Sequence, residues 1–215
     1  RLDFNLAPLH AQASLLSQRR VRLALAYCIN RVHLATASPD QGLVPAEGFL
    51  PPGHPAFDTE TLNRIEYNPE KGRALLNAAG WYDGDGDNLR EAHGVEGVPE
   101  GHPLTLTLHL APQYIFIAAH LSTDLSLCGV GIEPQPTEAQ TLYAADAASP
   151  LFGRTFELAL FGWQAEAPLV CGAWRSDRIP TPENGWRGEN FSGYTSAAYD
   201  GACERALTSV RTEVQ

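Results

Sequence analysis

The stretch "LTLTLHLAPQYIFIAAHLSTDLSLCGVGIEPQP", residues 104–136, contains the clearest strand in the chain. Residues 104–110 alternate strictly between apolar and polar side chains, which predicts a half-buried strand. Residues 115–128 predict a helix that Gly129 ends, and residues 130–136 predict a second strand. A strand, a helix and a strand in this order predict parallel strands with the helix packed on them.

The same alternation continues toward the C-terminus. Residues 138–147 predict a helix, and residues 156–163 predict an apolar strand. The fold class is therefore α/β, with a largely parallel or mixed sheet flanked by helices. Ligands of such sheets bind beyond the carboxyl ends of strands, so we expect the site after residues 104–110 and after residues 156–163.

The rest of the chain predicts further helices and one strand. Asn68 is placed to cap a helix, Pro69 suits its first turn and Gly80 can end it. Ser196 can cap the last helix. The predicted elements are a strand over 2–6, an amphipathic helix over 17–32, an irregular Gly/Pro-rich segment over 39–58, and helices over 68–81 and 197–210.

Composition places the chain among folded proteins and excludes some functions. Of its 215 residues 44% are apolar and 19% are charged, a balance that suits a folded protein. The formal charge of −10 argues against a nucleic-acid partner, which needs a basic surface. The sequence has no Met, even at position 1, and we expect it to be a piece of a longer protein.

The four cysteines leave two interpretations open. Cys171 and Cys203 could form a disulfide if the protein is exported, or could be two ordinary buried thiols. Cys28 and Cys128 lie on apolar helical faces, and we expect them to be core residues.

The run "YDGDGDNLREAHG", residues 82–94, offers a candidate calcium site. Asp83, Asp85, Asp87 and Glu91 have spacing that resembles an EF-hand loop. Counted from Asp83, however, the twelfth position is Gly94, so the bidentate glutamate of that loop is missing. A turn rich in Asp and Gly is the alternative that we favour.

The sequence gives little support for a catalytic site. The seven histidines are scattered without paired-ligand spacing, and neither GxSxG nor a phosphate-binding GxxxxGK[ST] occurs. Glu157 and Glu166 could be proposed as a carboxylate pair, but their spacing carries no signature of glycoside hydrolysis. We therefore expect no enzyme; the alternative is a secreted calcium-dependent α/β hydrolase whose catalytic residues are not recognised.

Seven segments together resemble one known family. They are "RRVRLALAYCINR", "GFLPPGHPAFD", "YNPEKGRALLNAAGW", "LTLTLHLAP", "VGIEPQP", "FELALFGW" and "NFSGYTSAAYD". In this order and spacing they resemble the extracellular solute-binding proteins of ABC importers, family 5, which bind oligopeptides, dipeptides and sometimes nickel. The resemblance implies the second lobe of a two-lobed protein of the periplasmic-binding type II fold.

This resemblance also implies how the chain is organised. Residues 1–215 would form a single α/β ligand-binding lobe, with a hinge strand near 1–6, an irregular loop over 39–67 and a sheet-and-helix core over 68–210. The partners would be a peptide-like solute, the missing first lobe and an ABC permease. The location would be periplasmic or at the cell surface, with a lipid anchor on the full-length protein. No cofactor is implied, and calcium remains the one alternative.

The most informative candidate is Glu166. In peptide-binding relatives an acidic residue three positions after the Trp of "GW" binds the ligand's α-ammonium group, and Glu166 stands three positions after Trp163. An ammonium group enclosed between lobes loses its water and needs a charge partner. Gly162, Gln164 and Ala165 would line the ligand beside Trp163.

Two other segments supply further candidates. Dipeptide-binding relatives carry an arginine after the strand equivalent to 104–110, where this chain has Gln113 and Tyr114. A fixed clamp for a ligand carboxylate is therefore in doubt. Asn190 and Tyr194, in the loop before the last helix, would contact the ligand or brace the lobe.

Overall fold

The computed structural model describes residues 1–9, 15–37, 44–46, 48, 50, 57, 60, 62, 64–163 and 170–213. The predicted irregular segment 39–67 lies largely outside the described residues. The strands are β1 (Leu2–Phe4), β2 (Trp81–Tyr82), β3 (Glu91–Ala92), β4 (Thr105–Leu110), β5 (Gly131–Pro136) and β6 (Leu158–Leu160). The helices are α1 (Arg19–Cys28), α2 (Arg31–Ala37), α3 (Pro69–Asn77), α4 (Ile115–Ser126), α5 (Ala139–Leu142) and α6 (Ala197–Glu213). Short 3₁₀ turns cover Leu15–Ser17, Pro112–Tyr114, Val170–Trp174, Ser176–Arg178 and Pro182–Asn184.

Four strands form one mixed sheet in the order β1-β6-β4-β5. β4 pairs in parallel with β5 and with β6, and β1 pairs antiparallel with β6. This confirms the predicted strand–helix–strand unit, because α4 connects two parallel neighbours. β2 and β3, which the sequence did not predict, form a separate two-stranded sheet.

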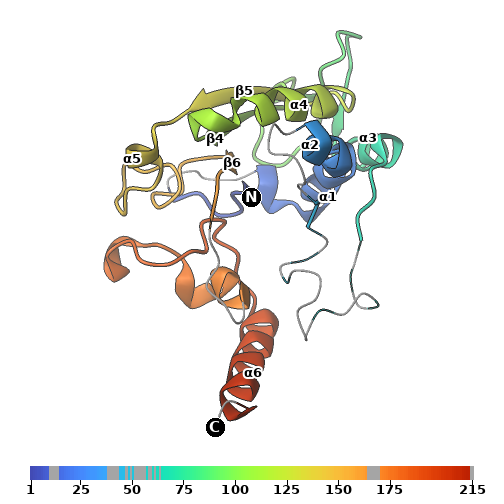
Figure 1. The fold of residues 1–215 in the computed structure, drawn as a ribbon. Coiled ribbons are helices and arrows are strands. Elements are labelled where there is room, and N and C mark those ends of the chain that lie inside the picture. The colour runs from blue at the N-terminus through green and yellow to red at the C-terminus, as the bar shows by residue number, and fades with distance from the viewer. Residues whose placement is uncertain are drawn as a thin grey trace.

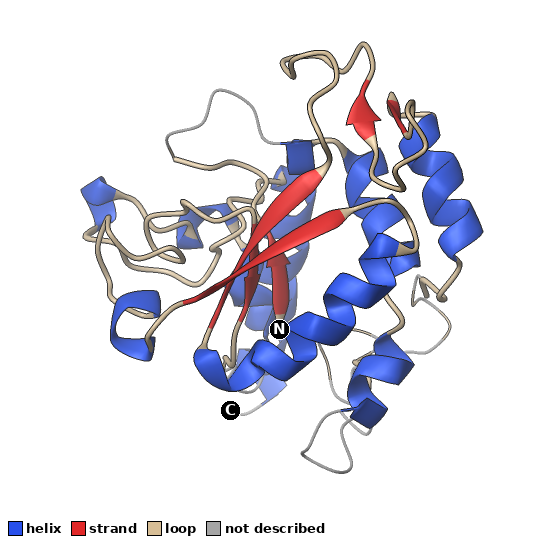
Figure 2. Ribbon diagram, turned by 90° about the horizontal axis from the view of Figure 1, so that it is seen from above, coloured by secondary structure: helices blue, strands red, loops and turns tan. Residues whose placement is uncertain are grey.

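The sheet separates two hydrophobic cores. Alternate residues Leu106, Leu108 and Leu110 of β4 are fully buried in the larger core, with α1, α3 and α4 packed in the same cluster. Figure 1 shows α4 lying along β4 and β5, with α1, α2 and α3 grouped beside it. Figure 2 shows most of the helical structure on one side of the twisted strands and looped segments on the other. The smaller core comprises Ala111, Leu142, Leu151, Phe152, Phe156, Ala159, Phe161 and Phe191.

The predicted start of α3 and the turn at Gly80 are confirmed, although the helix itself ends at Asn77, before the predicted bound of residue 81. The Asn68 side chain accepts a hydrogen bond from the Lys71 backbone N–H at 2.9 Å, and Pro69 opens the helix. Gly80 has a φ of +86°, the left-handed conformation that lets the chain turn after the helix. Ser196 Oγ likewise accepts from the Tyr199 N–H at 3.2 Å at the start of α6.

Two predicted helices are shorter than expected. The single helix predicted over 17–32 is broken at Ile29, whose φ of −92° and ψ of 118° are extended. Asn30 caps the new helix α2, and the buried Asp124 accepts the Asn30 backbone N–H at 2.9 Å. The helix predicted over 138–147 ends at Leu142, because the Asp146 carboxylate accepts from the Ala148 and Ser149 backbone N–H groups and forms a turn.

All four cysteines are paired. The predicted alternative of a Cys171–Cys203 disulfide is the one that the structure contains. A second disulfide joins Cys28 to Cys128, so the prediction that both are simple core residues is incomplete: they are buried, and they also cross-link the ends of α1 and α4. Among the described helices, none combines the length and apolarity that crossing a membrane requires.

Candidate functional site

The loops that follow β4 and β6 leave the sheet side by side. Leu110 pairs with Leu160 at the carboxyl ends of these two parallel strands. Residues 111–114 and 161–163 therefore begin at the same edge of the sheet, where α/β proteins bind ligands. We call the residues that gather there, Tyr114, Tyr143, Gly162 and Trp163, the aromatic mouth.

Gly162 lies between two tyrosine hydroxyls. Tyr143 donates a hydrogen bond from its hydroxyl to the Gly162 carbonyl at 3.0 Å. A Cβ atom placed on Gly162 would stand 2.8 Å from the Tyr114 hydroxyl oxygen, closer than real Cβ contacts come. Gly162 is exposed to solvent while both tyrosines are half-buried, so the main chain here faces outward with aromatic rings around it.

The Trp163 ring is held by a hydrogen bond to Glu189 and by packing against Phe161 and Phe191. Its indole N–H donates to Glu189 Oε2 at 3.3 Å. Its ring stands edge to face with Phe191 at a centroid distance of 5.0 Å and with Phe161 at 6.3 Å. The indole is thus fixed in orientation and still half-exposed, as a ligand-stacking ring needs to be.

Two charged residues, Arg1 and Asp3, lie next to the aromatic residues that pack against Trp163. The Arg1 guanidinium lies over Trp174 at 4.9 Å and over Phe161 at 5.4 Å from the ring centroids. Asp3 neutralises this cation through two short hydrogen bonds of 2.6 and 2.5 Å. A cation between aromatic faces with a carboxylate beside it rigidifies the base of the mouth.

The Tyr143 hydroxyl remains a proton donor at neutral pH. Burial raises the pKa of Tyr143 above its ordinary value, and the nearby Tyr114 raises it further. A raised pKa keeps the phenol protonated at neutral pH. The hydrogen bond from Tyr143 to Gly162 is therefore present throughout the physiological range.

The structure brings together some of the predicted ligand-binding residues. Gly162, Trp163 and Tyr114 meet in the mouth, and the exposed Gln113 stands beside Tyr114 in the same 3₁₀ turn. The predicted contacts of Gln164, Ala165 and Glu166 lie outside the described residues.

Asn190 lies inside its loop. Its side chain is fully buried, and its amide donates to the carbonyls of Trp174, Arg175 and Tyr194. Its amide oxygen accepts from Ser192 Oγ and from the Tyr194 N–H. A side chain whose hydrogen-bonding capacity is used in this way supports the predicted alternative that Asn190 braces the lobe. Tyr194, whose half-buried ring stands against Tyr199 at 5.8 Å, stays a prediction.

Two residues of the site were not predicted. Tyr143 lies in the segment where a helix was expected, and Glu189 precedes Asn190 in a loop. Neither belongs to a local motif, since each reaches the mouth across a long sequence separation, 19 residues for Tyr143 to Gly162 and 26 for Glu189 to Trp163. The available signal was the density of aromatic residues near residues 143, 161 and 163.

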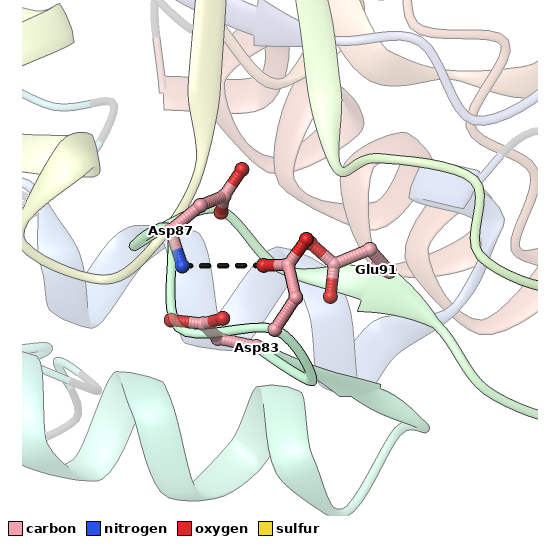
Figure 3. A group of neighbouring side chains, drawn as sticks. Asp83, Asp87 and Glu91 are labelled. Carbon is pink, nitrogen blue, oxygen red and sulfur yellow. Dashed lines mark hydrogen bonds between the residues drawn. The ribbon is translucent and has the colours of Figure 1, made fainter.

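The acidic run after α3 folds into one compact turn. Asp83, Asp85, Asp87 and Glu91 each place a carboxylate oxygen within 4.8 Å of the others, and Figure 3 shows three of them gathered at this turn. Their oxygens accept the turn's own N–H groups, including those of Gly84, Gly86 and Leu89. Such bonds are those expected of the Asp-Gly turn that we favour, and calcium binding there stays a prediction.

The carboxylate of Glu157 binds the neighbouring strand β4. Glu157 Oε2 accepts from both the N–H and the hydroxyl of Thr107, at 2.8 and 2.9 Å. Because these bonds tie the acid that precedes β6 to the adjacent strand, Glu157 has a structural role, which removes the support for a catalytic pair with Glu166.

Comparison with known sequences identifies a family. The sequence model of the "Bacterial extracellular solute-binding proteins, family 5 Middle" matches residues 1–174. No curated protein sequence matches the chain.

Comparison with solved structures shows the fold. The oligopeptide-binding protein from Thermus thermophilus, complexed with a pentapeptide, superposes with a TM-score of 0.77 at 20% identity, over 93% of this chain and 34% of that one. AppA from Bacillus subtilis, in complex with a nonapeptide, gives 0.75 at 21% identity, over 95% and 38%. NikZ from Campylobacter jejuni, in complex with Ni(L-His), gives 0.72 at 19% identity, over 95% and 38%. The chain thus has the periplasmic-binding-protein type II fold and spans little more than a third of the length of these structures.

Proposed function

Because the chain belongs to the bacterial extracellular solute-binding proteins of family 5, we propose that it forms one lobe of the substrate-binding component of an ABC importer. The complete protein captures a peptide-like solute between two lobes and delivers it to a membrane permease. The chain takes part in binding and catalyses no reaction, in keeping with a family of solute-binding proteins.

The observation that carries this proposal is the aromatic mouth. Outward-facing main chain at Gly162, flanked by the partly exposed rings of Tyr114, Tyr143 and Trp163, offers apolar contact at the ligand-binding edge of the sheet. The Trp163 ring is already held by Glu189 and Phe191. Little side-chain entropy is therefore lost when a solute binds, which favours affinity.

We assign the charge recognition to Glu166. Its place three residues after Trp163 puts it on the segment that leaves the mouth, and the family resemblance gives it the ligand's ammonium group. A carboxylate suits an ammonium group, because it offers both an opposite charge and hydrogen-bond acceptors. Gln164 and Ala165 would line the solute between Trp163 and Glu166.

The other end of the solute is less constrained. The loop after β4 offers the neutral donor Gln113 in place of a basic residue. A longer peptide, or a solute without a fixed terminal carboxylate, fits this loop better than a dipeptide does. The remaining polar contacts come from the partner lobe.

The two disulfides support an extracytoplasmic location. Structural disulfides persist in the periplasm and at cell surfaces, where the redox environment is oxidising. Such a location is the one from which an importer's binding protein collects its solute. A lipid anchor follows from the resemblance alone and stays a prediction.

The test compares two forms of one pentapeptide, AAKAA, with a free and with an acetylated α-amino group. Each is titrated into the 215-residue chain to millimolar concentration, with backbone amide chemical shifts as the readout. We expect the free peptide to bind several-fold more tightly, and Glu166→Gln to remove that difference. Glu96→Gln, at an exposed acid between β3 and β4, should preserve it. Equal binding of both peptide forms to the unaltered chain would refute the charge recognition.

A further inference from the structure

Tyr143 contacts the segment after β6 in two ways. Its hydroxyl donates to the Gly162 carbonyl at 3.0 Å, and its ring lies 6.4 Å from the Trp163 ring, tilted by 33°. It also stands edge to face with Phe161 at 6.5 Å. One side chain from outside the segment therefore touches three consecutive residues of it.

The base of Tyr143 is firmly anchored. It is the C-cap of α5, and its backbone N–H donates to the Ala139 carbonyl at 3.0 Å. The preceding Leu142 is fully buried in the smaller core, and its carbonyl accepts from Ser149 Oγ at 2.7 Å. Because Leu142 is held by burial and by this hydrogen bond, the backbone of Tyr143 has a fixed position, and its phenol ring extends from there to Gly162.

Gly162 is also confined by Tyr114. The Tyr114 hydroxyl oxygen occupies the place of a Gly162 side chain, 2.8 Å from the Cβ position. With one tyrosine bonded to the carbonyl and the other against the α-carbon, the Gly162–Trp163 peptide group has little freedom to rotate. The orientation of this peptide group in turn fixes the position of the Trp163 α-carbon, from which the indole extends.

We propose that Tyr143 is a positioning residue for the bound solute: its hydroxyl holds the Gly162–Trp163 peptide group in the orientation that the solute meets. This rests on the proposed function of the aromatic mouth. The Gly162 carbonyl accepts the Tyr143 hydrogen bond with one lone pair, and its second lone pair can accept a donor of the solute beside the ring faces. Ring faces select an aliphatic or cationic group over a carboxylate.

Three Gly–Trp pairs in the sequence make this inference directly measurable. They are residues 80–81, 162–163 and 185–186. A chain labelled with ¹³C-carbonyl glycine and ¹⁵N-tryptophan gives one carbonyl-to-amide NMR cross-peak for each pair. Tyr143→Phe keeps the ring and deletes the hydroxyl, so we expect the 162–163 peak to move while the other two stay as internal references.

The binding arm uses the same samples and the free AAKAA peptide. We expect Tyr143→Phe to raise the Kd about three- to tenfold, as loss of one hydrogen bond implies, with an unchanged Tm. An unchanged Tm separates positioning from stability, because the Tyr143–Gly162 bond lies at the surface. Tyr82→Phe, an exposed tyrosine on β2, is the matched control and should alter neither the 162–163 peak nor the Kd.

The outcomes distinguish the two levels of the proposal. A moved 162–163 peak with weaker peptide binding supports the positioning role. Wild-type affinity in Tyr143→Phe overturns that role and leaves the proposed function intact. A peptide that leaves the 162–163 peak of the unaltered chain in place overturns the proposed function and the positioning role together.

Discussion

Gly72 packs against the disulfide between Cys28 and Cys128, in the first half of α3. A Cβ atom at this position would clash with Cys28 Sγ and stand 3.0 Å from the Ala24 carbonyl oxygen. The contact brings α3 close to α1, and the two helices bury Val21, Leu25 and Leu76 in the larger core. A single missing methyl group therefore permits the helix packing around the disulfide.

The replacement Gly72→Ala should destabilise the protein. Helix propensity favours alanine, but the clash involves a cross-linked sulfur and a backbone carbonyl that cannot move freely, so we expect a net loss of about 1–3 kcal/mol in the free energy of unfolding. Urea denaturation measures it. Gly172→Ala is the control, since a Cβ there meets no atom within 4 Å. Equal stability of the two variants would contradict the packing argument.

His109 gives the fold a pH dependence. Its side chain is half-buried on β4, and Nδ1 lies 3.2 Å from the Thr137 hydroxyl. Burial lowers the pKa of His109 below its ordinary value of 6.5. Between that ordinary value and the lower folded value, the unfolded chain binds the proton more readily, so this group's effect on stability worsens as the pH falls.

We expect His109→Gln to reduce the loss of stability between about pH 7 and pH 5. The glutamine retains a hydrogen-bonding group toward Thr137 and does not take up a proton in this range. Urea unfolding of the variant and of the unaltered chain at both pH values gives the comparison. The same variant made at the exposed His102 should lose as much stability as the unaltered chain does. A larger loss in His109→Gln would reverse the sign of the argument.

Among the elements, α6 is tied to the loop before it through contacts of its first half. Figure 1 shows it extending away from the sheet. The Cys171–Cys203 disulfide joins it to the 3₁₀ turn Val170–Trp174, and the Tyr199 hydroxyl donates to the Cys171 carbonyl at 2.8 Å. Asp200 accepts the Ser176 N–H at 3.0 Å. These contacts cluster at the first half of the helix, which makes the cross-link its main anchor.

Replacement of Cys171 and Cys203 together by serine should loosen α6. The lost cross-link closes a loop with a sequence separation of 32, worth about 3–4 kcal/mol in the chain-entropy model. We expect hydrogen exchange to accelerate in α6 and to stay slow in β4. Glu204→Gln, which removes the Arg175 ion pair at an exposed site, should have a far smaller effect. Unchanged exchange in α6 after loss of the disulfide would contradict the anchoring role.

The elements that could be predicted are those with local signals. β4, α4 and β5 follow from strict alternation, helical spacing and Gly129, and their order requires parallel pairing. The break at Ile29 could not be predicted, because the buried Asp124 that accepts the Asn30 N–H is distant in sequence. Cys28 and Cys128 are separated by 100 positions, and four cysteines allow three pairings.

The location of the candidate site could be predicted from the sequence, but only some of the residues that form it could. Parallel strands end at one edge, so the loops carrying Tyr114 and Trp163 could be located from the pattern. Tyr143 and Glu189 could not, because their roles arise from contacts made across the fold. The choice between ligand contact and bracing for Asn190 could not be made from the sequence for a similar reason: a polar residue in a loop gives no sign that its amide is used internally.

At the scale of the whole molecule, the proposed function makes this chain one wall of a binding site. A solute held between two lobes draws its affinity from both, and closure requires that it bind the closed state better than the open one. We therefore expect the 215-residue chain alone to bind peptides with a Kd in the millimolar range. Calorimetry giving a micromolar Kd for this chain alone would contradict the two-lobed proposal.

The central claim is that Glu166, three positions after Trp163 in the sequence, holds a positively charged, peptide-like solute. Mass spectrometry of the solute retained by the protein, purified without denaturation from the cells that make it, tests this most directly. We predict that denaturation releases a peptide-like cation from the unaltered protein and at least tenfold less of it from Glu166→Gln. Release of an anionic or uncharged solute, or equal amounts from both proteins, would contradict the claim.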